Sequence, residues 1–252
     1  MKRKIKVYAL VCCLVLGLGL FLTSCKKETV AQVGYAEGQD FAMTSEIDFW
    51  QLGNDSIITI SILAKIGDVY ITVGTETDQE PIKEVFYNGT YYSYGNVSDK
   101  NDLGAPYWHW YISDPQPQHS EISLKEDFET MLQMVKLSNL LITIPILEEP
   151  WVTKIKDTTE KVDEKLLKVA VYQGAADNEE GGLFEANAIF QYYADEFLYN
   201  IETTVKIREA GSTEFKTIER SNTRFTYNKA PTLADYGIDL AVLDALAADA
   251  QA

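Results

Sequence analysis

Apolar and polar residues alternate along much of this chain, and a period of two is typical of half-buried β-strands. The alternation is clear in residues 41–50, and Ile58, Ile60 and Ile62 repeat it in the next segment. Similar patterns, or short β-branched and aromatic runs, predict further strands at 69–73, 82–87, 91–94, 107–112, 151–155, 166–172, 183–192, 197–207 and 215–227. Short turns separate many of these segments, which predicts an antiparallel sheet.

One of these turns carries a specific signal. Asn88-Gly89 lies between the segments 82–87 and 91–94. Both residue types tolerate a positive φ, which the type I′ turn of a two-residue hairpin requires. The sequence therefore predicts a tight β-hairpin at this position.

The period changes to that of a helix in the middle of the chain. Ser123 and Glu126 have the form of a capping box at its start. The apolar stripe that follows consists of Leu124, Phe128, Met131, Leu132 and Val135. We expect one amphipathic helix over 123–137. We also expect Pro145 to keep the apolar segment 140–147 out of the centre of the sheet.

The first 25 residues have the order of an export signal. Four basic residues precede an apolar run over 7–22, and small residues then precede Cys25. The run is shorter than the roughly 20 apolar residues of a transmembrane helix, so an export signal is the better interpretation. Leu22-Thr23-Ser24-Cys25 resembles a bacterial lipobox, and this resemblance implies a diacylglyceryl group on the sulfur of Cys25. The alternative is an ordinary secretory signal that happens to contain a cysteine.

This leader defines the domain boundaries that we expect. Residues 1–24 would be removed as the signal peptide. Residues 25–40, polar and glycine-containing, would form the lipidated cysteine and a flexible tether. The antiparallel β-rich domain would span 41–231, and the tail 232–252, rich in Ala and Leu, would be partly helical.

The chain is strongly acidic, with a formal net charge of −16 that becomes −20 without the four basic residues of the leader. Nucleic-acid binding needs clustered Lys and Arg, so the composition excludes that partner, and it argues against a basic face lying on anionic lipid. Cys12 and Cys13 lie in the leader, which leaves Cys25 as the only cysteine of the mature chain and excludes a disulfide within it. The membrane would therefore hold the protein through the acyl chains on Cys25.

Residues that carry common enzyme chemistry are missing or scattered. The two histidines, His109 and His119, are not at a metal-binding spacing, and a zinc site would need further Cys or His ligands. Phosphate-binding loops and nucleophile elbows are missing as well, and no pair stands out among the 38 acidic residues. We therefore expect a protein without enzymatic activity, without a cofactor and without a metal site.

Aromatic residues gather on the predicted strands, most densely at 107–112. Packing between neighbouring strands explains most of them. Trp108 and Trp110 have a second interpretation, as the wall of a groove for an apolar ligand or for sugar rings. Met131 and Met134 similarly suit a core or an irregular acyl-chain cavity.

Together these features resemble the LolA-like group, which includes the outer-membrane lipoprotein carrier and the LppX/LprG-type mycobacterial lipoproteins. The features are the lipobox, the hairpin Phe-Tyr-Asn-Gly-Thr-Tyr-Tyr at 86–92, the Trp strand, the central helix and the closing segment 225–231. The resemblance covers 41–231. It implies an α+β, mainly β fold: a curved, half-barrel antiparallel sheet with one central amphipathic helix on its concave side and an apolar cavity between them.

On this resemblance, the predicted function is that of a lipoprotein on the extracytoplasmic face of the cell membrane that binds or carries a lipid or other apolar ligand. The apolar stripe of the helix would face a sheet wall built by Phe49, Ile60 and Trp110. The candidate ligand-binding residues are Phe49, Ile60, Trp108, Trp110, Phe128, Met131, Leu132 and Val135. Two alternatives stay open: an adhesion or glycan-binding module with exposed aromatic residues, and a structural lipoprotein without a small ligand.

Overall fold

Eleven strands form one open antiparallel sheet in the described part of the chain. The computed structural model describes residues 29–97, 107–113, 124–143, 151–177 and 181–250. Its elements are β1 (Phe41–Gln51), β2 (Ile57–Ile66), β3 (Val69–Glu76), β4 (Ile82–Tyr87), β5 (Thr90–Val97), β6 (Tyr107–Ile112), α2 (Leu124–Met134), α3 (Leu137–Thr143), β7 (Val152–Val162), β8 (Lys165–Asp177), β9 (Leu183–Tyr192), β10 (Leu198–Arg208), β11 (Lys216–Asn228), η1 (Leu233–Tyr236) and α5 (Leu240–Asp249). This confirms the predicted fold class, mainly β within α+β, with a curved, half-barrel antiparallel sheet and an amphipathic helix on one face.

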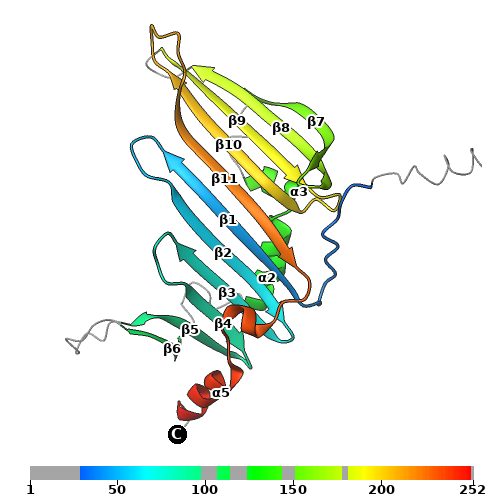
Figure 1. Cartoon of the computed structure of the whole chain (residues 1–252), viewed down its shortest axis with the longest axis vertical. Coiled ribbons are helices and arrows are strands. Elements are labelled where there is room, and N and C mark those ends of the chain that lie inside the picture. The colour runs from blue at the N-terminus through cyan, green and yellow to red at the C-terminus, as the bar shows by residue number, and fades with distance from the viewer. Residues whose placement is uncertain (1–28, 98–106, 114–123, 144–150, 178–180, 251–252) are drawn as a thin grey trace, which may run out of the picture. The chain divides into compact units, whose positions relative to one another are not determined.

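The sheet consists of two meanders that meet at its centre (Figure 1). Strands β1 to β6 follow one another toward one edge, and strands β11 back to β7 follow one another toward the other. The first and last strands join the two halves, because β1 pairs with β11 from Ala42↔Asn228 to Gln51↔Glu219. Strands β6 and β7 are therefore the two edges of the sheet.

The sheet has a hydrophobic core on each face. On the first, here called the α2 face, the helix α2 covers β2 and β3. Buried residues of this core include Phe41, Leu63, Tyr70, Phe128 and Leu132. On the opposite side, the α5 face, η1 and α5 cover the sheet. Buried residues of this second core include Ile71, Val85, Tyr92, Ile238 and Leu243.

The strand predictions hold except in length. Asn88 and Gly89 have φ angles of 49° and 78°, so the predicted hairpin with two positive φ angles is confirmed. The segment predicted at 151–155 is the first part of the longer β7 (Val152–Val162), in which most residues are exposed and none is buried. An edge strand with polar residues on both faces has no alternation from which its length could be predicted.

Strand pairing, and not the end of the apolar stripe, terminates the central helix. The helix predicted over 123–137 is α2, which ends at Met134; Ser123, and with it the expected capping box, lies outside the described residues. Leu198 N donates to Val135 O (3.1 Å), and Leu137 N donates to Glu196 O (3.0 Å). These contacts with the start of β10 interrupt the helix, and the chain continues as α3.

Residues 31–40 are attached to the folded domain, in contrast to the tether expected over 25–40. Ala31 N donates to Leu166 O (2.8 Å), and Gly34 N donates to a carboxylate oxygen of Asp195 (2.7 Å). Tyr35 Oη also donates to Glu129 Oε1 on α2 (2.6 Å). The compact unit accordingly begins at Ala31. The sequence places this boundary at residue 41 because 31–40 shows no alternation.

Candidate ligand-binding cleft

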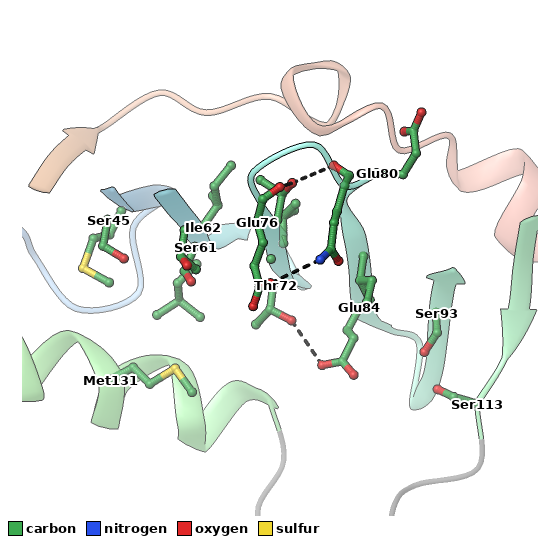
Figure 2. A pocket seen from close by; sticks show the side chains of 18 of the residues that line it. Ser45, Ser61, Ile62, Thr72, Glu76, Glu80, Glu84, Ser93, Ser113 and Met131 are labelled. Carbon is green, nitrogen blue, oxygen red and sulfur yellow. Dashed lines mark hydrogen bonds between the residues drawn. The ribbon is translucent and has the colours of Figure 1, made fainter. Parts of the chain in front are cut away.

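A cleft of about 1020 Å³ opens on the α2 face, between α2 and the half of the sheet that begins with β1 (Figure 2). This volume is at the upper end of the roughly 300–1,000 Å³ of small-molecule sites. Every strand from β1 to β6 contributes residues to its lining, and the helix contributes Met131 and Met134. The cleft is thus built by the first meander and the central helix together.

The strand register explains how the cleft arises. Residues that pair directly across neighbouring strands point to the same face, so the α2 face can be described as rows. The row beside the core consists of Phe41, Lys65, Tyr70, Phe86 and Tyr91. The second row consists of Met43, Leu63, Thr72, Glu84 and Ser93. The third row consists of Ser45, Ser61, Gly74 and Ile82.

Small side chains in the third row leave space above the sheet. Ser45, Ser61 and Gly74 are direct neighbours, and a Cβ atom added to Gly74 would find no heavy atom within 4 Å. Met131 and Met134, on the helix side, remain 42% and 48% exposed. Large apolar side chains that stay exposed in this way are typical of a binding surface.

The residues of the predicted helical stripe proposed as ligand contacts, three in α2 and Val135 directly after it, divide into two groups. Phe128 and Leu132 are fully buried in the core, each with 0% exposure, and the Phe128 ring lies 6.0 Å from that of Tyr70. Met131 and Val135 line the cleft. The helix therefore uses one part of its stripe for packing and leaves the adjoining part open.

The sheet residues proposed as one wall lie on opposite faces. The register places Phe49 on the α2 face, beyond the residues that line the cleft. Ile60 and Trp110 point to the α5 face, where Trp110 packs against the second core. Trp108 also lies there, and the rings of Trp108 and Trp110 are 5.8 and 5.4 Å from that of Tyr94. These two tryptophans take part in cross-strand packing away from the cleft.

The cleft is apolar toward β1, β2 and the helix and acidic toward β3–β5. The apolar lobe consists of Met43, Leu63, Met131, Met134 and Val135. The acidic lobe consists of Thr72, Glu76, Glu80, Glu84 and Ser93. Figure 2 shows Met131 on the helix, opposite the sheet, and Glu76 and Glu84 on the sheet side of the cleft. Within the acidic lobe, Thr72 Oγ1 donates to Glu84 Oε2 (3.3 Å). Lys, Arg and His are absent from the described residues that line the cleft.

Sequence reasoning missed the floor and the acidic lobe of the cleft. A signal for the floor exists on β1, where Ser45 interrupts the apolar side of the strand between Met43 and Ile47. Gly74 follows directly after the predicted strand 69–73, within the observed β3, and is a second small residue in the floor. Small residues at positions that should pack against a helix indicate either close approach or empty space.

A second depression, of about 560 Å³, lies near the start of the compact unit and is lined by Lys165, Tyr199, Arg224 and Lys229, among others. Its charges are partly paired: the Asp163 carboxylate accepts from Tyr199 Oη and from Arg224 Nη2, both at 2.6 Å. The hydrogen bond from Tyr199 lowers the pKa of Asp163, and the charge of Arg224 adds to this effect. We regard this cluster as structural.

Two searches of the described residues bear on other functions. No three or more His, Cys, Asp or Glu side chains in the described ranges are placed to hold a metal ion. No helix within those ranges is long and apolar enough to span a membrane. Cys25 lies outside the described residues, so its modification stays a prediction.

Comparison with known proteins gives similarity of structure only. No protein-family model and no curated protein matches the sequence. The Mycobacterium tuberculosis lipoprotein LppX is similar over 76% of this chain and 88% of its own, at 10% identity and a TM-score of 0.31. A LolA superfamily protein of Nitrosomonas europaea is similar over 81% and 92%, at 9% identity and a TM-score of 0.24. An LppX lipoprotein and a LolA superfamily protein are the two kinds of protein that the sequence resembles.

Proposed function

We propose that this protein binds or carries a lipid or other apolar ligand in the cleft on the α2 face. It would do so without enzymatic activity, as a lipoprotein anchored through Cys25 on the extracytoplasmic side of the cell membrane. The observation that carries the ligand proposal is the open space above Ser45, Ser61 and Gly74, flanked by two exposed methionines.

The energetic reason for ligand binding is incomplete burial of apolar surface. Complete burial of a Met side chain contributes about 1.5–3 kcal/mol. Neither Met131 nor Met134 is completely buried by other residues of the chain. The unbranched thioether side chain adapts to irregular apolar partners. An acyl chain in the apolar lobe would cover these two side chains and contact the already buried Met43 and Leu63.

We expect Gly74→Phe to block the cleft. Gly74 does not have a positive φ, so a phenylalanine is compatible with its backbone, and its ring would occupy the space over the third row. In the chain from Lys26 onward, which keeps the whole compact unit from Ala31, affinity for the neutral dye N-phenyl-1-naphthylamine should fall about tenfold or more, equivalent to about 1.4 kcal/mol. Dye fluorescence measures the affinity, and thermal melting shows that the variant is folded.

The matched control is Asn222→Phe, which places the same ring on the α5 face of β11. Asn222 is exposed and pairs there with Asp48 and Glu202, so dye affinity should not change. A folded Gly74→Phe protein that binds dye like the original would place the ligand elsewhere. An original protein that binds no dye and copurifies with no extractable mass would favour the structural alternative.

We expect Cys25→Ser to abolish the incorporation of fatty acid into the full-length protein. The serine hydroxyl cannot replace the thiol as the site of the diacylglyceryl group, which would supply the acyl chains that anchor the protein. Labelling of growing cells with radioactive palmitate measures the incorporation, which should fall to background. Cys12→Ser, a change within the leader, is the control and should be labelled like the original. A Cys25→Ser protein that is labelled as strongly as the original would contradict lipidation at this residue.

A further inference from the structure

The acidic lobe carries negative charge that would favour a ligand with a positively charged head group. Glu76, Glu80 and Glu84 line it, and none of the described lining residues carries a positive charge. Two lysines on neighbouring strands have other partners: Lys83 Nζ donates to Tyr236 O on the α5 face (2.7 Å), and Lys65 Nζ donates to Gly38 O (2.9 Å). The negative charge of the lobe is therefore left without a cation from the strands that form it.

A hydroxyl on the wall of the cleft also points to a ligand at this position. Ser93 lines the cleft and is only 7% exposed, and no hydrogen bond joins its side chain to another described residue. Its oxygen is not among the fully buried polar atoms without a partner, which in the described residues are Gln39 Nε2 and Asn200 Oδ1. It pairs in register with Glu84 on one side and with Tyr111 on the other. A head group in the cleft at this position could therefore hydrogen bond to it.

Aromatic rings complete the environment. Tyr111 of β6 pairs with Ser93, and Tyr91 lies two residues before Ser93 on β5; both line the cleft. Carboxylates and tyrosine rings in one cleft form the combination that binds alkylammonium groups, through Coulomb attraction and through contact of the cation with the ring faces. An anionic phosphate or sulfate would meet three glutamates and no cation.

We propose that the cleft binds an amphiphile with a cationic, alkylammonium head group. The head group lies in the acidic lobe beside Glu84 and Ser93, and the chain extends into the apolar lobe beside Met131. This inference rests on the proposed function, because it assigns an orientation and a charge to the ligand of the same cleft.

The test is a competition among three detergents that share a twelve-carbon chain. Dodecyltrimethylammonium, dodecyl maltoside and dodecyl sulfate displace N-phenyl-1-naphthylamine from the chain that begins at Lys26, each below its micellar concentration. We expect the cation to bind about tenfold or more tightly than the sulfate, with the neutral maltoside between them. The preference should diminish as salt is added, because salt screens exposed charges.

Charge-neutral variants locate the preference. Glu84→Gln should reduce the preference for the cation over the sulfate severalfold and leave the affinity for the maltoside unchanged. Glu46→Gln is the control, because Glu46 is exposed on β1 and points to the α5 face, and it should have no effect.

The possible outcomes separate the two proposals. Equal binding of all three detergents, or tighter binding of the sulfate, would overturn the cationic head group and leave the apolar cleft standing. A cation preference that survives Glu84→Gln would overturn the assigned position of the head group. Failure of the dye and of all three detergents to bind would overturn the proposed function and this inference with it.

Discussion

Phe128→Ala is expected to lower the free energy of unfolding by about 3–5 kcal/mol, the usual cost of removing a large buried aromatic side chain. Phe128 is 0% exposed, and its ring meets the edge of Tyr70 at 6.0 Å and 70°. Among the α2 residues whose burial is described, 128–134, Phe128 and Leu132 are the two fully buried side chains. Loss of the Phe128 ring would leave a cavity where the helix packs on the sheet. Urea unfolding followed by far-UV circular dichroism measures this change.

Met131→Ala is the matched comparison, because it truncates the same helix on its open side. Met131 is 42% exposed, so its loss should cost less than about 1 kcal/mol while weakening ligand binding. Equal losses of stability for the two variants would contradict the division of α2 into a packed part and an open part.

The second large effect is expected at alkaline pH. Desolvation by burial is the main cause that raises the pKa of Tyr70, Tyr192, Tyr193, Tyr199 and Tyr227 above the ordinary value of 10.0. A tyrosine with a raised pKa in the folded state keeps its proton there longer than in the unfolded chain. Its contribution to stability is complete below pH 10 and is lost as the pH rises through the folded-state pKa. The protein should therefore unfold above pH 10.

The steepness of this transition gives the number of tyrosines involved. A tyrosine that is ionised in the unfolded state but not in the folded state lowers the free energy of unfolding by about 1.4 kcal/mol per pH unit. Absorbance at 295 nm and circular dichroism should then change together between pH 10 and pH 12. Tyr193→Phe removes one ionisable group and should reduce the slope by one such increment. Complete tyrosine ionisation without loss of structure would contradict the burial of these side chains.

Most strands could be predicted from the sequence because their alternation is local. The alternation in residues 41–50 shows the apolar side of β1 directly. Asn88-Gly89 specifies the turn between β4 and β5 through backbone conformation alone. The end of α2 could not be predicted, because it depends on pairing of Val135 and Leu137 with distant residues. The attachment of residues 31–40 to the domain could not be predicted either, because it depends on hydrogen bonds to the distant residues Asp195 and Glu129.

The candidate site was harder to predict because alternation identifies the apolar side of a strand but not the face of the sheet to which that side points. Adjacent strands β1 and β2 each have an apolar side, and the natural expectation is that both sides meet the same helix. The register shows otherwise: Met43 points to the α2 face, whereas Ile60 and Ile62 point to the α5 face. This opposition leaves Ser61 of β2 on the α2 face. Because the apolar sides of β1 and β2 point to opposite faces, Ile60 lies on the α5 face and the small Ser61 lies over the cleft.

The pairing of β1 with β11 also affects how the chain can reach its final state. Synthesis proceeds from the N-terminus, so the edge of β1 that pairs with β11 stays without its partner until this last strand has been made. Contacts between such distant segments make folding slow, and an unpaired strand edge invites pairing with other chains. Before closure, the two halves of the sheet share no strand neighbours. A nascent chain of this topology therefore exposes one edge of β1 until β11 is available to pair with it.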